Sequence, residues 1–254
     1  SWYDAERKGQ LIDTQTSYAL PLAFHVVDGD LQKKMAAHLA AAIKTPMAGY
    51  PAYSLLTGFI GTAWISKALS DNGMSEEAYR LLQYEGYPSW LYPVKNGATT
   101  IWERLNSYTV KDGFGENNSM NSFNHYSFGA VASWMYNYSL GICRDEKSPG
   151  FKHFILKPEV DPTRGITHAE GYYDSMYGRI RSRWQYTDSG IRYEFTVPAN
   201  TTASLYLPAP AVSFISENGK PLKKASGVRY VSADKELHHL ELASGSYQFD
   251  IKQK

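Results

Sequence analysis

The spacing of the hydrophobic residues changes near Cys143, and this change constrains the fold more than any other feature of the chain. Before Cys143, apolar residues recur every three or four positions, which is typical of amphipathic helices. After the charged stretch RDEKSPGFKH, apolar and polar residues alternate, which is typical of half-buried strands. We therefore expect two domains, a helical one over residues 1–143 and a β-sandwich over residues 144–254.

The sequence predicts five helices in the first domain, over residues 17–27, 31–43, 59–70, 75–84 and 127–140. The second of them follows Asp30, a good N-cap, and has an apolar residue at every fourth position: Leu31, Met35, Leu39 and Ile43. The first is apolar nearly all round, so both of its sides should be covered. Pro21 should kink this first helix or confine its start.

Two other helices place their apolar side chains on one face. In the third helix the shared face consists of Ile60, Ala63, Trp64 and Ala68. In the fifth helix the stripe consists of Phe128, Val131, Met135 and Tyr138. We expect Trp64 and Trp134 to belong to the hydrophobic core rather than to a binding site.

The second domain is predicted to be an antiparallel β-sandwich. A hairpin is expected where two alternating sets flank the turn TDSG: Ile180, Ser182, Trp184 and Tyr186, then Ile191, Tyr193, Phe195 and Val197. Trp184 should be a core residue. Further strands are expected over residues 203–207, 228–232, 237–242 and 247–251, with a turn at Asn218-Gly219.

Composition excludes several classes of partner. The 26 Lys and Arg residues balance the 25 Asp and Glu residues, so no nucleic-acid partner is expected. The sequence contains no run of about 18 apolar residues, so no membrane span is predicted. Cys143 is the single cysteine, so no internal disulfide can form. No phosphate-binding glycine motif or metal-ligand spacing occurs, so neither a cofactor nor a metal is expected. His238 and His239 should point to opposite faces of a strand.

Residues 86–124 form a long segment with little helical period and many Trp, Tyr, Asn and Gly residues. Long ordered loops are usually functional. In the densest piece, ATTIWER, the carboxylate of Glu103 lies between an indole and a guanidinium, and a second piece, MNSFNHY, follows over residues 120–126. Taken alone, Glu103 would be read as a solvated loop residue.

These motifs resemble those of a known family. GYPSWLYPVKNGATTIWER and MNSFNHYSFGAVASWMY are similar to segments of the glycoside hydrolases that include the bacterial α-L-rhamnosidases. The resemblance extends to TQTSYAL and LLTGFIGTAWISKALSDNG, so it covers most of residues 11–142, and FILKPEVDPTRGITHAEGYYDSMYGRIRSRW resembles the sandwich that follows. It implies the C-terminal half of an (α/α)6 barrel that removes terminal α-L-rhamnose with inversion, followed by that sandwich.

The resemblance also implies roles for individual residues. Glu103 is identified as the general base, which activates water, while a second carboxyl protonates the leaving oxygen. In the family this general acid lies further upstream of the base than the 102 residues that precede Glu103 here, so we expect it outside this sequence. Five helices are also fewer than a complete barrel holds. The N-terminal remainder of the enzyme or a second chain should therefore complete the barrel.

Five neighbours of Glu103 are substrate-binding candidates, each with a structural alternative. His125, in SFNHY, is implied to bind the sugar, but alone it would be read as a packing residue at a helix start. Asn124 binds substrate or is an N-cap. Trp90 and Trp102 stack on the deoxyhexose or belong to the core of the loop. Arg104 favours the charged form of Glu103 or has a structural role.

The leading hypothesis is hydrolysis of terminal α-L-rhamnose from a rhamnose-containing oligosaccharide or glycoside, with little turnover by this chain alone. The count of 20 Tyr and 6 Trp suits a sugar ligand, although it also suits an ordinary aromatic core. A non-catalytic carbohydrate-binding or interaction module is one alternative. Another (α/α)6 hydrolase or lyase is the second, because barrels of this type host several chemistries.

Overall fold

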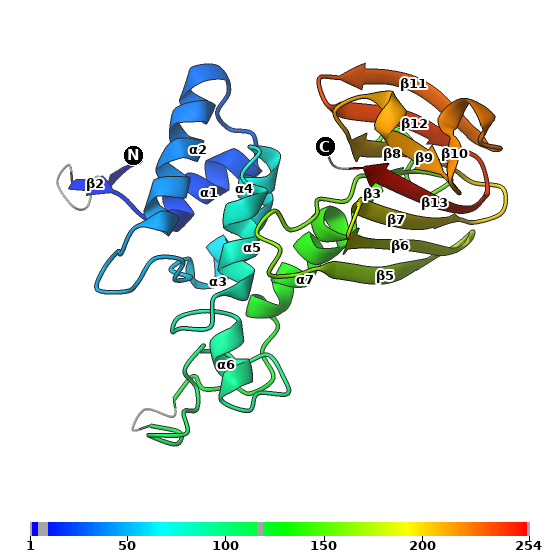
Figure 1. The fold of residues 1–254 in the computed structure, drawn as a ribbon. Helices are drawn as coiled ribbons and strands as arrows, with labels where there is room; N and C mark the ends of the chain where they lie inside the picture. The colour runs from blue at the N-terminus through cyan, green and yellow to red at the C-terminus, as the bar shows by residue number, and fades with distance from the viewer. Residues whose placement is uncertain (1, 5–9, 116–118, 253–254) are drawn as a thin grey trace. The chain divides into compact units, whose positions relative to one another are not determined.

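The computed structural model describes residues 2–4, 10–115 and 119–252. The chain forms two compact units, a helical one over Ser1–Trp134 and a β-rich one over Met135–Lys254 (Figure 1). Within the described ranges, no helix has both the length and the apolar character needed to span a membrane. The same residues contain no group of three His, Cys, Asp or Glu side chains that could hold a metal ion.

The helical unit opens with a short hairpin and continues through seven α-helices in its described residues. The hairpin pairs β1 (Trp2–Asp4) with β2 (Gln10–Ile12). The helices are α1 (Gln15–Ala23), α2 (Gly29–Lys44), α3 (Gly58–Thr62), α4 (Ile65–Asp71), α5 (Ser75–Gln83), α6 (Leu91–Lys95) and α7 (Val131–Trp134). A 3-10 turn over Ser127–Ala130 leads into α7. The sequence did not predict α6.

The first two helices differ from expectation at their ends. Thr14 and Ser17 form a capping box that starts α1 two residues early, and Pro21 lies inside the helix. Asp28, not Asp30, is the N-cap position of α2, and its side chain makes no capping hydrogen bond, so the predicted cap at Asp30 is wrong. Leu31 is 55% exposed, whereas the other three members of its predicted stripe are buried in the core.

The third predicted helix is interrupted at Trp64, where α3 ends and α4 begins. Gly61 of α3 approaches α1 so closely that a Cβ there would overlap the side chains of Thr16 and Thr57. Trp64 is half-buried and packs against Phe24, with ring centroids 4.6 Å apart. The predicted shared face is wrong at its first member, because Ile60 is 71% exposed.

The fifth predicted helix changes its winding along its length. The 3-10 turn, α7 and a π-helical turn over Met135–Ser139 follow one another, so the side chains do not keep a 3.6-residue period. Consequently Phe128 is buried but Met135 is exposed, and the predicted stripe is wrong there. Trp134 is a core residue as predicted: its Nε1 donates to Ser70 Oγ at 2.9 Å.

The β-rich unit consists of two sheets (Figure 1). The six-stranded sheet has the order β10-β9-β13-β7-β6-β5 and the five-stranded sheet the order β11-β12-β8-β4-β3. The strands are β3 (Ile142–Arg144), β4 (His153–Leu156), β5 (His168–Ser175), β6 (Gly178–Thr187), β7 (Gly190–Val197), β8 (Thr202–Pro208), β9 (Ile215–Glu217), β10 (Lys220–Pro221), β11 (Val228–Asp234), β12 (Leu237–Leu242) and β13 (Gly245–Lys252). All described strand pairs are antiparallel except β4 with β8.

The predicted hairpin and turns of this unit are present. Strands β6 and β7 pair in register through the turn after Thr187, and Asn218-Gly219 joins β9 to β10 with positive φ at both residues. Trp184 of β6 is fully buried, and its Nε1 donates to Ser139 O at 2.8 Å. His238 is buried while His239 is partly exposed, as expected for opposite faces of β12.

Gly141, which precedes β3, is expected to be intolerant of substitution. Its φ is +68°, and a Cβ there would overlap the backbone of Lys157 and Pro158. Strain at positive φ and overpacking together should lower the free energy of unfolding of Gly141→Ala by about 2–5 kcal/mol. Urea denaturation measures this change.

Gly219→Ala is the matched control, because Gly219 also has positive φ but no atom within 4 Å of an added Cβ. This variant should lose only about 1 kcal/mol. Equal destabilisation of the two variants would contradict the argument from the close approach of the backbone.

Candidate active-site segment

The segment that follows α5 is tied to the rest of the helical unit by polar contacts. Leu55 N donates to Pro88 O at 2.8 Å, next to the cis Tyr87–Pro88 bond. The indole Nε1 of Trp90 donates to Phe128 O at 2.9 Å, and Trp90 is buried. Trp90 therefore anchors the start of the segment to the 3-10 turn at its far end.

The two sequence pieces around Glu103 and His125 lie side by side. Glu103 N donates to Ser122 O at 2.8 Å, and His125 N donates to Ile101 O at 2.8 Å. Thr100 Oγ1 also donates to Phe123 O. Residues 100–103 are thus paired with residues 122–125, which brings both predicted motifs to one place.

The carboxylate of Glu103 is fixed through one of its oxygens. Oε2 accepts a hydrogen bond from Ser122 N at 2.8 Å. Two hydrogen bonds therefore join these residues, because the backbone N–H of Glu103 also donates to Ser122 O. Within the described part of the chain, Oε1 has no hydrogen-bond partner, and the residue is half-buried. An anchored carboxylate with one open oxygen can accept a proton from water.

The backbone at Arg104 is held by a buried serine. Ser107 Oγ accepts from Arg104 N at 3.2 Å and donates to Arg104 O at 2.9 Å. Asn121 links the two motifs again, because its Oδ1 accepts from Arg104 Nε at 3.4 Å and its Nδ2 donates to Ser107 O at 3.2 Å. Burial raises the pKa of Tyr87, while the positive charge of Arg104 acts in the opposite direction.

Trp102 belongs to an aromatic cluster that includes Phe123 of the second motif. Its ring meets that of Phe123 edge-on at 5.2 Å and that of Tyr108 at 6.4 Å, and Phe114 contacts both of those rings. Trp102 is buried, so this cluster supports the backbone on both sides of Glu103. Sugar stacking by Trp102 and Trp90 remains a prediction.

His125 is oriented by contacts with two aromatic rings and by one hydrogen bond. Its imidazole stacks against Phe59 at 4.7 Å and against Tyr126 at 5.5 Å. Ser127 N donates to Nδ1 at 3.4 Å, so the neutral imidazole carries its proton on Nε2. Tyr126 is 85% exposed. This arrangement leaves Nε2–H as a donor for a ligand hydroxyl.

Asn124 lies in the turn between the motifs. Its N–H donates to Ser122 Oγ at 3.1 Å, and the side chain is exposed. The 3-10 turn that follows has Tyr126 at its N-cap position, so the alternative reading of Asn124 as the N-cap is wrong. Sequence reasoning missed Ser122, because a backbone N–H that binds the carboxylate leaves no side-chain signature.

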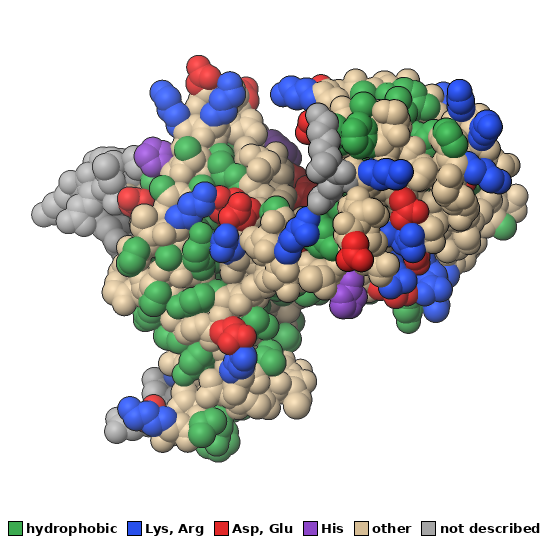
Figure 2. All heavy atoms as spheres, in the orientation of Figure 1, with side chains coloured by type: hydrophobic (Ala, Val, Ile, Leu, Met, Phe, Trp, Pro, Cys, Tyr) green, Lys and Arg blue, Asp and Glu red, His purple; other side chains and the backbone are tan. Residues whose placement is uncertain are grey.

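A hydrophobic surface lies on the helical unit. A groove of about 490 Å³ is lined by one face of α1 and its flanking residues: Ile12, Thr14, Thr16, Ser17, Leu20, Pro21, Phe24 and Val26. Phe24 and Val26 are 54% and 67% exposed, and Ile60 and Ile101 are also exposed. Figure 2 shows hydrophobic side chains at many places on the visible surface of this unit. Exposed apolar side chains that gather around a groove can mark a site of contact with another part of a protein.

Comparison with known families matches both units. Residues 2–139 match the bacterial α-L-rhamnosidase six-hairpin glycosidase domain, and residues 141–221 match the bacterial α-L-rhamnosidase C-terminal domain. An α-L-rhamnosidase of Streptomyces avermitilis is 34% identical over 98% of this chain, which spans 22% of that relative. One of Alteromonas sp. strain LOR is 34% identical over 94% of the chain, which spans 24% of it.

Solved structures agree with these matches. The crystal structure of a Streptomyces avermitilis α-L-rhamnosidase complexed with L-rhamnose is similar over 99% of the chain and 23% of its own length, with TM-score 0.83 and 32% identity. That of an α-L-rhamnosidase from Dictyoglumus thermophilum gives TM-score 0.78 at 27% identity, over 94% of the chain and 25% of its own length. The chain therefore spans about a quarter of its relatives, and the predicted fold class, a partial helical barrel followed by a sandwich, is confirmed.

Proposed function

Because the chain belongs to the bacterial α-L-rhamnosidase six-hairpin glycosidase family, we propose that it carries the general base for hydrolysis of terminal α-L-rhamnose with inversion. Glu103 is that base. The geometry of its carboxylate supports this role: Oε2 is fixed by Ser122 N, and Oε1 has no hydrogen-bond partner among the described residues. Such a group stays oriented while it removes a proton from water.

The second carboxyl of the reaction lies outside these 254 residues in our proposal. An inverting glycosidase needs an acid about 6.5–9.5 Å from the base, with a water between the base and the sugar. The acid protonates the leaving oxygen as Glu103 takes the proton of the attacking water.

The sugar is proposed to contact the exposed groups around Glu103. His125 Nε2–H donates to a hydroxyl, and the exposed side chains of Tyr126 and Ile101 offer apolar contact for the methyl group of a 6-deoxy sugar. The similarity to a structure described as a complex with L-rhamnose supports this choice of sugar. Arg104 and Asn124 flank the same site. A rhamnose-containing oligosaccharide or glycoside is the proposed substrate.

The remaining part of the barrel is proposed to cover the hydrophobic surface of α1 and α3. A six-hairpin domain contains six helical hairpins, whereas the described residues hold seven α-helices, three of them with five residues or fewer. Covering Phe24, Val26 and Ile60 with further helices would bury the exposed apolar area. The same helices would bring the general acid to the substrate.

Turnover of an aryl α-L-rhamnoside tests the proposal. The 254-residue chain alone should turn over about 10²–10⁴-fold more slowly than the same chain joined to the upstream part of its reading frame, because it lacks the acid. A colorimetric assay of the released phenol measures both rates. Equal rates for the two forms would exclude a general acid outside the chain, and no turnover by either would exclude the proposed reaction.

A further inference from the structure

The outer face of the six-stranded sheet carries a polar groove of about 580 Å³. Along β6 the buried side chains of Ile180, Ser182 and Trp184 alternate with outward ones, which include Arg181 and Arg183. Six of the polar residues that line the groove come from four strands and the β9–β10 turn: Glu170, Arg181, Arg183, Glu194, Asn218 and Gln248. The groove belongs entirely to the β-rich unit.

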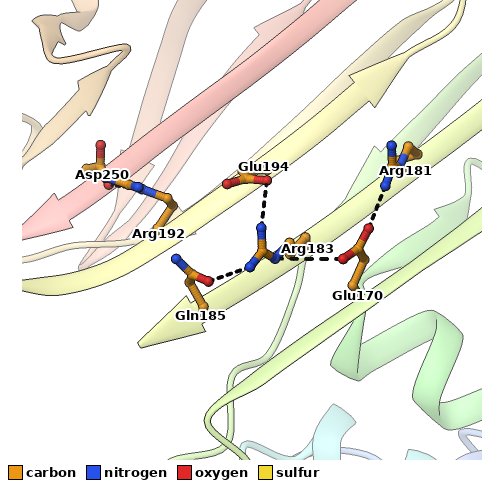
Figure 3. A network of polar contacts seen from close by, with 7 residues as sticks. All are labelled: Glu170, Arg181, Arg183, Gln185, Arg192, Glu194 and Asp250. Atoms are coloured by element: carbon orange, nitrogen blue, oxygen red, sulfur yellow. Dashed lines mark hydrogen bonds and ion pairs between the residues drawn. The ribbon is translucent and has the colours of Figure 1, made fainter. Parts of the chain in front are cut away.

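Ion pairs hold the walls of this groove in fixed positions. Arg181 Nη2 donates to Glu170 Oε1 at 2.5 Å, and Arg183 Nη1 donates to Glu194 Oε2 at 3.3 Å. Arg183 Nε lies 3.8 Å from Glu170 Oε2, and its Nη2 donates to Gln185 Oε1 at 2.6 Å. Figure 3 shows these side chains lying across neighbouring strands. Two arginines and two glutamates therefore cancel each other's charge within the groove.

Several polar atoms of the groove remain available to a ligand. Within the described ranges, no hydrogen-bond partner is found for Glu194 Oε1, for Nε and Nη1 of Arg181, for Gln248 Oε1 or for Asn218 Oδ1. The groove therefore offers both hydrogen-bond donors, from a guanidinium group, and acceptors, from carboxylate and amide oxygens. The ion pairs could serve only to fix the register of neighbouring strands. That role would not require the polar atoms without a partner to lie together on one concave surface.

We propose that this groove binds a neutral oligosaccharide. Its volume lies within the range of small-molecule sites, about 300–1,000 Å³. A neutral sugar hydroxyl both donates and accepts, which matches open carboxylate and amide oxygens beside guanidinium N–H groups. Because the two arginines are already paired with Glu170 and Glu194, the groove has no net charge that would favour an anion or a cation. An apolar ligand would leave its polar groups unpaired. The inference goes beyond the proposed function, and only the choice of rhamnose as the test sugar rests on that function.

Nuclear magnetic resonance of the arginine side chains tests the proposal in the 254-residue chain. The Nε–Hε signal of Arg181 should shift when an L-rhamnose trisaccharide is added, while that of Arg192 should not. Arg192 is the internal control, because it lies on the same sheet, pairs with Asp250 at 2.7 Å and does not line the groove (Figure 3). A galacturonate trisaccharide, which is anionic, should shift neither signal.

Calorimetric titration of variants supplies the second measurement. Arg181→Ala and Glu194→Ala should each weaken binding of the rhamnose trisaccharide about tenfold or more, because each removes a charged hydrogen-bonding group. Asp174→Asn is the matched control and should leave the affinity unchanged, because Asp174 pairs with Arg179 on the same sheet but neither residue lines the groove. No shift of the Arg181 signal with the neutral trisaccharide, or a larger shift with the anionic one, would overturn the proposal. Neither result bears on hydrolysis.

Discussion

Replacing Glu103 with glutamine in the protein with a complete barrel is expected to lower kcat for an aryl α-L-rhamnoside by about 10²–10⁴-fold. The amide keeps the shape of the side chain and an oxygen that can accept from Ser122 N, as Oε2 does now at 2.8 Å. It cannot take a proton from water. The expected loss therefore falls on the chemical step, and steady-state kinetics measures it.

Glu85→Gln is the matched control for this experiment. Glu85 belongs to the same helical unit, is exposed and forms an ion pair with Lys95 at 3.0 Å. Its replacement should leave kcat unchanged and cost at most about 1 kcal/mol of stability. Similar losses of kcat in both variants, or a loss below tenfold in Glu103→Gln, would contradict the role of Glu103 as base.

Replacing Trp184 with alanine is expected to lower the free energy of unfolding by about 3–5 kcal/mol. Trp184 is fully buried in the sandwich and packs edge-on against Tyr186 at 6.0 Å. The truncation leaves a cavity the size of the indole. It also removes the donor to Ser139 O, which leaves a buried carbonyl without that partner. Urea denaturation of the chain, followed by a signal from the β-rich unit, measures the change.

Trp184→Phe separates the two contributions. Phenylalanine keeps most of the buried ring but cannot donate to Ser139 O, so the expected cost is about 1–3 kcal/mol. If Trp184→Ala cost no more than Trp184→Phe, packing of the indole would not be the main contribution to stability.

Periodicity predicted those parts of the fold that depend on local sequence. The helix around Leu39 and the hairpin through Thr187 are present because their buried sides face a packed core. The interruption at Trp64 could not be predicted, because it follows from the contact of Gly61 with Thr16 and Thr57, residues outside that helix. The parallel pairing of β4 with β8 depends on a connection of more than forty residues, which periodicity does not encode.

The resemblance indicated the residues of the candidate site, but the sequence did not predict the contacts that connect its two motifs. The resemblance placed Glu103 and His125 in one site, and the structure brings their motifs together. The contact that orients the carboxylate is the N–H of Ser122, and any residue but proline carries a backbone N–H. Periodicity alone placed Ile60 on a shared apolar face, but it does not say whether other residues of the same chain cover that face, and Ile60 is exposed.

The anomeric form of the first product tests the central claim most directly. Proton magnetic resonance, recorded during the first minutes of hydrolysis of an α-L-rhamnoside by the protein with a complete barrel, distinguishes the two anomers of released rhamnose. If Glu103 activates water opposite the leaving group, β-L-rhamnose should appear first and the α anomer only later, by mutarotation. Initial release of α-L-rhamnose would mean retention, and it would contradict the assignment of Glu103 as the general base of an inverting hydrolase.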